Sequence, residues 1–309
     1  MLRPQTLLGL ALLAVTGCQS LGGGTTRAKF PVQPEVFLDR FKAAEGIAFN
    51  GRGELFIAAD RAVWRVTPAG EVTQLAELDS NLGLAGIGDS DVLAADFGPT
   101  NVFRDGPNDD GVIWRIARDG GKTAVARGIA DPNFIQVLGG GSFLVSDDGT
   151  DTIYRVDGDG EVEVWSREVA FPNGMVFSLD GATLYVAQIF SAIGPVVLDD
   201  RIWALAVENG MPAGPARLVG HTGGQGVDGL ALDEVGRIYV ADNGSGSVRR
   251  IDPETGEVTI LAEGVANVAS LVFGEGDFDP TALYATSTFR GGGKIWKIPV
   301  GVRGAPVRR

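Results

Sequence analysis

A short strand-like segment recurs six times along the chain and constrains the fold more than any other feature. In each copy, apolar residues alternate with a large or basic residue, which is typical of a strand buried on one face. The copies are Val63–Val66, Ile113–Ile116, Ile153–Val156, Ile202–Leu205, Val248–Ile251 and Ile295–Ile298. A second apolar segment precedes each copy, so the repeating unit contains at least two neighbouring strands.

Residues 225–258 contain the clearest copy of the whole unit. Three short apolar runs are separated by a turn at Gly236 and by a polar loop, and a fourth run begins after Pro253–Gly256. Proline and glycine supply the backbone angles that tight reversals need. Four-stranded units of roughly 40 residues are typical of β-propellers. We therefore expect an all-β fold, a six-bladed β-propeller with four-stranded blades, over residues 34–300.

Two segments without partners indicate how the ring closes. The sixth unit ends at Val300 without a fourth strand, and Glu35–Leu38 lies before the first blade. Pairing this N-terminal strand with the sixth blade would complete the blade and remove an exposed edge. Residues 301–309 then form a tail. The competing architecture, a pair of β-sandwiches, would not explain a repeat that runs through all six units.

The first 18 residues have the features of an export signal. Arg3 gives a positive start, Leu7–Val15 is apolar but too short to span a bilayer, and small residues lead to Cys18. This arrangement resembles the lipobox of bacterial lipoproteins, in which the cysteine is lipidated. The alternative is an ordinary signal peptide with an incidental cysteine. Residues 19–33 read as a flexible tether.

Cys18 is the only cysteine, so the folded domain has no disulfide and no thiolate site. Gln19 and Ser20 follow it, and no aspartate is present to retain a lipoprotein at the inner membrane. By resemblance to lipoprotein sorting, we expect a lipid-anchored protein of the bacterial cell envelope, at the outer membrane and facing the periplasm or the exterior.

The net charge of -13 argues against nucleic acid or anionic lipid as a partner, because phosphate groups are bound mainly by clustered Lys and Arg. An acidic surface suits a cation or a small uncharged ligand. The expected partner is a small-molecule substrate, the expected membrane contact is the lipid anchor alone, and the expected state is a monomer.

In four blades, a polar residue stands eight positions before the glycine of the first hairpin. The four residues are Glu45, Asn133, Asn173 and Asp228. The four residues share one position in the repeating unit, the start of the innermost strand. The pseudo-symmetry of a propeller would therefore bring the four side chains to one mouth of the central channel. For one position alone, an Asn or Asp that opens a turn before a strand would be the better explanation, but the four residues share one register. Two carboxylates and two amides offer only oxygen donors, which favours a hard cation such as Ca²⁺.

Three segments that contain these positions resemble the senescence marker protein, gluconolactonase and luciferin-regenerating enzyme family. They are Ala44–Phe49, Phe171–Met175 and Val227–Asp233. The resemblance covers roughly residues 35 to 300. It implies a six-bladed propeller with one divalent metal, held directly by Glu45, Asn173 and Asp228. Asn133 is similar to the residue that holds a metal-bound water or the substrate. Ca²⁺ is the expected ion, with Zn²⁺, Mn²⁺ and Mg²⁺ as alternatives.

The resemblance also implies hydrolysis of a lactone or related ester. The metal would polarise the carbonyl and activate a water, and Asp228 is the candidate catalytic proton acceptor. Sugar-lactone members usually have an Arg where this chain has Asp131, and a small polar residue where it has Phe134. A less polar substrate is therefore expected. The alternatives are a non-catalytic propeller of the NHL-repeat kind, which binds a ligand or protein, and a strictosidine synthase-like propeller.

Two long loops are expected on the same face as these residues. The segment 189–200 is apolar, which suits either a wall for the substrate or packing against a neighbouring loop. The segment 97–111 is acidic and is interpreted as a solvated loop rather than a second calcium site. Asp60, Asp147 and Asp242 end second strands and are expected to hold turns. His221 is the only histidine and is not expected to be catalytic.

Overall fold

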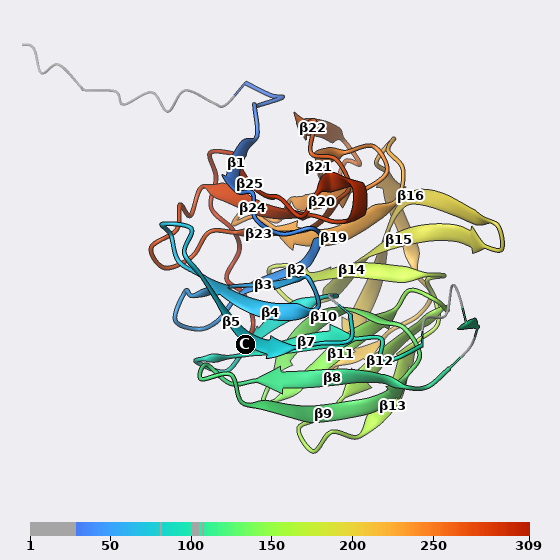
Figure 1. Cartoon of the computed structure of the whole chain (residues 1–309). Coiled ribbons are helices and arrows are strands. Elements are labelled where there is room, and N and C mark those ends of the chain that lie inside the picture. Colours follow the sequence, from blue (N-terminus) through green and yellow to red (C-terminus); the bar gives the residue numbers. More distant parts are fainter. Residues whose placement is uncertain (1–28, 81, 101–104, 107) are drawn as a thin grey trace, which may run out of the picture.

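The computed structural model describes residues 29–309 except positions 81, 101–104 and 107. Over this part of the chain, the strands form six antiparallel sheets. Figure 1 shows the sheets arranged in a ring in the order of the sequence. The innermost strand of each sheet contacts the innermost strand of the next, and the last contacts the first. The fold is the six-bladed β-propeller that the repeats predict.

Blades one to three each have four strands that run outward from the centre in sequence order. Blade one consists of β2 (Ala44–Phe49), β3 (Leu55–Ala59), β4 (Ala62–Val66) and β5 (Val72–Glu77). Blade two consists of β6 (Leu84–Ile87), β7 (Asp91–Asp96), β8 (Gly111–Ile116) and β9 (Lys122–Ile129). Blade three consists of β10 (Pro132–Gly139), β11 (Ser142–Asp147), β12 (Thr152–Val156) and β13 (Val162–Ser166).

Blades four and five repeat this order, with one elaboration. Blade four consists of β14 (Pro172–Phe177), β15 (Thr183–Ile193), β16 (Val196–Glu208) and β18 (Arg217–His221), and the short β17 (Met211–Pro212) pairs with the end of β16. Blade five consists of β19 (Val227–Leu232), β20 (Ile238–Asp242), β21 (Ser247–Ile251) and β22 (Val258–Glu263). Much of the expected loop 189–200 is thus an extension of the β15–β16 hairpin, because its apolar, β-branched residues continue the strand pairing to Ile193 and Val196.

Blade six contains strands from both ends of the chain. It consists of β23 (Val268–Phe273), β24 (Ala282–Ser287), β25 (Ile295–Pro299) and β1 (Glu35–Leu38), with the short 3₁₀ helix η1 (Phe289–Gly291) between β24 and β25. Strand β1 pairs antiparallel with β25, and Val36 lies opposite Trp296. The predicted ring closure by the N-terminal strand is confirmed.

Apolar side chains hold neighbouring blades together. The buried core of the described residues falls into six clusters, each of which joins two adjacent blades. The aromatic residues of the third strands pack against these clusters, and some also donate hydrogen bonds to the second strands. The indole of Trp64 donates to the carbonyl of Ala59 at 2.9 Å, and that of Trp203 donates to Oε1 of Gln188 at 2.8 Å. These residues serve packing, as their spacing predicts.

Candidate metal centre

The four sequence-predicted site residues occupy equivalent places in the fold. Glu45, Asn133, Asn173 and Asp228 are each the second residue of the innermost strand of their blade, in β2, β10, β14 and β19. Asn133, Asn173 and Asp228 are buried, and Glu45 is partly exposed. The innermost strands of blades two and six carry no equivalent acid or amide.

A glycine follows three of these residues and allows the inner strands to approach closely. At Gly174, an added Cβ would lie 2.2 Å from the carbonyl oxygen of Asp228; at Gly46, it would lie 2.1 Å from that of Leu82. Any side chain larger than hydrogen would push these backbones apart. The Glu-Gly, Asn-Gly and Asp-Gly pairs therefore supply the donor and also the room that lets the donors meet.

Asp148 lies between two of the predicted residues. Its Oδ2 accepts hydrogen bonds from Nδ2 of Asn133 at 2.9 Å and from Nδ2 of Asn173 at 3.5 Å. Both amides thus use their NH₂ group on the same carboxylate. The amide oxygen Oδ1 of Asn173 and Oδ1 of Asp148 are buried, and neither has a hydrogen-bond partner. These oxygens are free to accept a cation.

A second amide chain holds Asp228. Nδ2 of Asn243 donates to Oδ2 of Asp228 at 3.3 Å, and Nδ2 of Asn267 donates to Oδ1 of Asn243 at 3.1 Å. Asn243 directly follows β20, and Asn267 directly precedes β23, so loops of blades five and six orient this carboxylate. Fixing both side chains in this way leaves the ligand set little freedom to rearrange.

The carboxylates at this mouth repel one another. Burial, reinforced by the charge of Asp148, raises the pKa of Glu45 to about 8. Burial, together with Glu45 and Asp148, also raises the pKa of Asp228 well above its ordinary value, although the hydrogen bond from Asn243 opposes this effect. These effects show that Glu45, Asp148 and Asp228 share one electrostatic environment. A positive charge placed there would be strongly favoured.

Two further buried acids stand beside Asp148. Burial, the charge of Asp148 and a side-chain hydrogen bond with that carboxyl raise the pKa of Asp131 to about 10. Burial raises the pKa of Asp147 to about 6, although a backbone hydrogen bond from Gly149 opposes the shift. Asp131 stands where sugar-lactone relatives usually have an Arg, so this mouth is more acidic than the resemblance implies.

The donor set fits a hard divalent cation. Glu45, Asn173 and Asp228 offer oxygen only, and the unpartnered Oδ1 of Asn173 is an open acceptor. Within the described residues, no three His, Cys, Asp or Glu side chains by themselves form a group that could hold a metal. Since the predicted ligand set contains only two carboxylates, the site depends on the asparagine amide.

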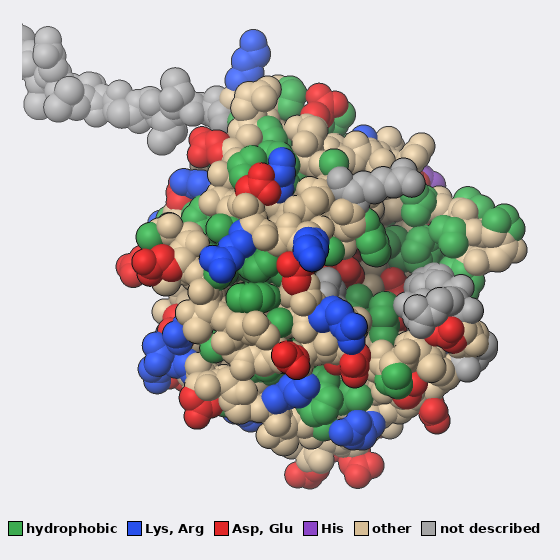
Figure 2. Space-filling model, viewed as in Figure 1, with side chains coloured by type: hydrophobic (Ala, Val, Ile, Leu, Met, Phe, Trp, Pro, Cys, Tyr) green, Lys and Arg blue, Asp and Glu red, His purple; other side chains and the backbone are tan. Residues whose placement is uncertain are grey.

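An apolar wall flanks this mouth. An added Cβ at Gly226 would lie 3.1 Å from Leu198, and one at Gly244 would lie 2.8 Å from it, so Leu198 covers the backbone beside Asp228 and Asn243. Phe190 of the same hairpin packs edge-on against Phe171, two residues before Asn173, with ring centroids 6.2 Å apart. The hairpin tip projects from the molecule at the right of Figure 2, and Val196 and Val197 are exposed there.

Other candidates lie apart from the site or have structural roles. Oδ1 of Asp60 accepts the backbone N–H of Lys42 at 3.0 Å, and that of Asp242 accepts the N–H of Gln225 at 2.8 Å, as expected of residues that hold turns. His221 lies on the outermost strand β18, where Nδ1 is 2.7 Å from Oδ1 of Asp200. The acidic loop 97–111 lies partly outside the described residues.

Sequence reasoning missed Asp148 and Asn243. The repeat does contain a pattern that identifies them. The second strands β11 and β20 both end on an aspartate that holds a turn, and the residue after that aspartate points into the mouth. Ser-Asp-Asp at 146–148 and Ala-Asp-Asn at 241–243 are in register. The position after the turn-holding aspartate would have identified both.

The fold and this oxygen-donor cluster define a class: a six-bladed propeller with an acidic site at the starts of its inner strands. Residues 31–289 match the family described as the SMP-30/Gluconolactonase/LRE-like region, and the chain belongs to this family. Membership supports a lactonase-type hydrolase, in agreement with the resemblance noted in the sequence.

Individual relatives are more distant. Regucalcin of Xenopus laevis is 30% identical over 131 residues, which are 42% of this chain and 41% of that protein. The match thus spans less than half of that relative. A gluconolactonase from Xanthomonas campestris has a TM-score of 0.69 at 19% identity, over 85% of this chain and 88% of that one. A calcium-binding regucalcin from Agrobacterium tumefaciens has a TM-score of 0.65 at 20% identity, over 89% and 99%.

The predicted lipidation residue Cys18 lies outside the described residues. Among the residues that are described, no helix is long and apolar enough to cross a membrane.

Proposed function

We propose that this protein is a divalent-metal-dependent hydrolase of a lactone or related ester. The observation that carries the proposal is the acidic mouth, where burial and the charge of Asp148 raise the pKa of both Glu45 and Asp228 while the amide oxygen of Asn173 has no hydrogen-bond partner. Such an arrangement is unfavourable by itself and becomes favourable around a cation.

Glu45, Asn173 and Asp228 would hold the ion directly. The all-oxygen donor set suits Ca²⁺, and one relative with the same fold is a calcium-binding regucalcin. When bound, a divalent ion supplies Lewis acidity that polarises a carbonyl and lowers the pKa of a water. Asp148 would act on the ion indirectly, since it binds the NH₂ groups of Asn133 and Asn173 and so turns their oxygens toward the centre.

The side chains of the chain itself would supply position and proton transfer. Asn133, whose NH₂ group donates to Asp148, would orient the substrate or the attacking water. Asp228 would accept the proton of that water, because its carboxylate is held in place by the amide of Asn243.

The surroundings favour a substrate with an apolar group. Leu198 and Phe190 of the blade-four hairpin form an apolar wall beside the site. Phe134 follows Asn133, where sugar-lactone relatives usually have a small polar residue. A neutral lactone or ester with an alkyl or aryl substituent fits this mouth better than a polyhydroxylated sugar lactone.

The test is a hydrolysis assay with a panel of lactones that differ in alkyl length, together with gluconolactone, before and after chelation. Asp228→Asn removes a ligand and the base with little change of shape, and Asp252→Asn, at a partly exposed acid in a turn, is the matched control. We expect activity on alkyl lactones that chelation and Asp228→Asn both abolish. Metal binding without turnover of any lactone would instead favour the NHL-like, ligand-binding alternative.

The location of the protein is a separate part of the proposal. The lipobox-like sequence ending at Cys18 and the absence of an aspartate after it support a lipid-anchored protein at the bacterial outer membrane. The expected tether of residues 19–33 ends against the propeller, where the backbone N–H of Val32 donates to the carbonyl of Leu261 at 2.7 Å. A tether of this length would keep the propeller close to the lipid surface.

A further inference from the structure

The central channel has a second chamber at the end opposite the candidate metal centre. This cavity of about 600 Å³ is lined by residues at or near the C-terminal ends of the innermost strands, among them Phe49, Val137, Phe177, Leu232 and Phe273. Asp228 and Leu232 belong to the same strand, four residues apart. At about 3.3 Å per residue, the two sites are separated by about 13 Å along the channel.

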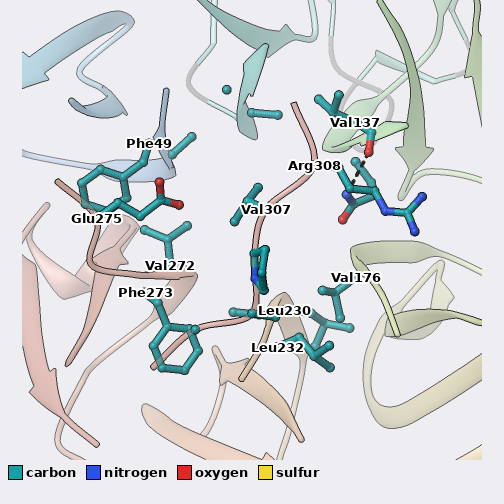
Figure 3. A pocket seen from close by; sticks show the side chains of 18 of the residues that line it. Phe49, Val137, Val176, Leu230, Leu232, Val272, Phe273, Glu275, Val307 and Arg308 are labelled. Carbon is teal, nitrogen blue, oxygen red and sulfur yellow. Dashed lines mark hydrogen bonds between the residues drawn. The ribbon is translucent and has the colours of Figure 1, made fainter. Parts of the chain in front are cut away.

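The C-terminal tail crosses this chamber and forms part of its wall. The backbone N–H of Glu234 donates to the carbonyl of Arg303 at 3.0 Å, and that of Ala305 donates to the carbonyl of Leu232 at 2.9 Å. Gly304 lies against Phe273 so closely that an added Cβ would be 2.5 Å from the phenylalanine Cβ. Figure 3 shows the tail running through the chamber, with Val307 near its middle.

The tail is also held on its far side. The guanidinium carbon of Arg308 lies 4.7 Å from the ring centroid of Phe177, and Arg309 forms an ion pair with Glu275. The tail therefore contacts blades four, five and six. Because these contacts hold the tail at several points, the tail forms a fixed part of the chamber wall.

The charge of this chamber is opposite to that of the protein. Its charged lining residues in the described chain are one glutamate and three arginines, an excess of two positive charges in a protein whose net charge is -13. Glu275 is already paired with Arg309. The exposed Arg308 stands near Val137 and Val176 in Figure 3.

We propose that this chamber is a second ligand site, separate from the candidate metal centre, for a small amphipathic monocarboxylate. The alkyl part of the ligand lies against Phe49, Leu232 and Phe273, and its carboxylate pairs with Arg308 at the mouth. The volume lies within the roughly 300–1,000 Å³ range of small-molecule sites.

The test is a calorimetric titration of decanoate into the full chain carrying Cys18→Ser, which removes the need for detergent, with EDTA present so that no metal binds the carboxylate. We expect saturable binding at one site. Arg308→Gln should weaken it about 10-fold or more, because a charge-assisted hydrogen bond is lost. Val307→Trp should also weaken it by filling the chamber. Decanol should bind more weakly than decanoate and be insensitive to Arg308→Gln.

Two variants serve as controls. Arg40→Gln makes the same charge change at an exposed arginine that does not line the chamber, and Glu45→Gln alters only the metal mouth. Both should bind decanoate as the parent does. The proposal is wrong if the parent shows no saturable binding, if Arg308→Gln or Val307→Trp binds normally, or if Glu45→Gln abolishes binding.

Discussion

Asn133 donates from Nδ2 to Oδ2 of Asp148 at a distance of 2.9 Å, and this bond fixes which end of the amide faces the candidate metal centre. Asp148 makes a longer bond of the same kind, at 3.5 Å, to Asn173. One carboxylate thus sets the orientation of two amides from different blades. A residue in this position would control the proposed metal site without being one of its ligands.

The first prediction concerns this control. Asp148→Ala frees the amides of Asn133 and Asn173 to rotate, so calcium affinity and lactone hydrolysis should fall about 10- to 100-fold. Asp151→Asn is the matched control, since this acid lies three residues away and pairs with Arg167 at the surface. Calcium titration followed by calorimetry measures the change. Equal affinities in the parent and Asp148→Ala would show that the carboxylate does not orient the amides.

The second prediction concerns metal removal. Because the ion binds the folded protein only, calcium at about 100 times its Kd should stabilise the fold by about 2.7 kcal/mol over the chelated protein. Thermal unfolding with and without EDTA measures this difference. In Glu45→Gln, the response to calcium should shrink or vanish. A Tm that calcium leaves unchanged in the parent would count against a metal site at this mouth.

The third prediction concerns pH in the chelated protein. The pKa of Glu45 is raised from 4.5 to about 8 in the fold, so the folded state holds this proton more tightly than the unfolded state does. The resulting stabilisation is complete below about pH 4.5 and is lost as the pH rises through about 8. The Tm in EDTA should therefore fall between about pH 5 and pH 8.

Two comparisons isolate the cause of that pH dependence. Glu45→Gln cannot ionise at this position, so its Tm should vary less with pH over the same range. Saturating calcium should reverse the slope, because the ion binds the deprotonated carboxylates. A Tm in EDTA that increases steadily from about pH 5 to pH 8 would contradict the prediction.

The fourth prediction concerns ring closure. The ring of Phe37 in β1 packs edge-on against Tyr284 and Phe278 of blade six, with centroids 5.3 and 6.0 Å away. Phe37→Ala should lower the free energy of unfolding by about 2 to 3 kcal/mol. Val36→Ala alters an exposed residue of the same strand and should change it by less than about 0.5 kcal/mol. Denaturant unfolding of both variants measures the contrast, and equal losses would argue against this role for Phe37.

The fifth prediction concerns the lipid anchor. If Cys18 is lipidated, cells grown with labelled palmitate should incorporate the label into the parent protein, which should fractionate with the outer membrane. Cys18→Ser should abolish both labelling and membrane association. Persistence of the label in Cys18→Ser would place the lipid elsewhere, and its absence from the parent would favour an ordinary signal peptide.

The sequence alone was enough to predict the blades, because each one repeats the same strand spacing and the two unpaired segments could only complete each other. It was also enough to place Glu45, Asn133, Asn173 and Asp228 at one strand position. Asp148 and Asn243 were missed because their role depends on contacts between blades, which strand spacing does not reveal. The extended blade-four hairpin was read as a loop, because an apolar segment with a central Gly-Pro does not show where pairing stops.

The tail illustrates the same limit. Residues 301–309 are rich in Gly, Pro and Arg and have no strand pattern, so their sequence suggests no position. Their place in the channel depends on the close fit of Gly304 against Phe273 and on the contact of Arg308 with Phe177. Both are contacts between segments that are far apart in the chain.

The pairing of β1 with β25 also determines when the protein can finish folding. Strand β1 is the first to be synthesised, and its partner β25 is the last. A growing chain therefore contains all four mouth residues well before the ring that holds them can close. Contacts between such distant segments form slowly, because the entropy of a long loop is lost before the contact is gained. The proposed metal site should therefore be completed only after β25 has been made and has paired with β1.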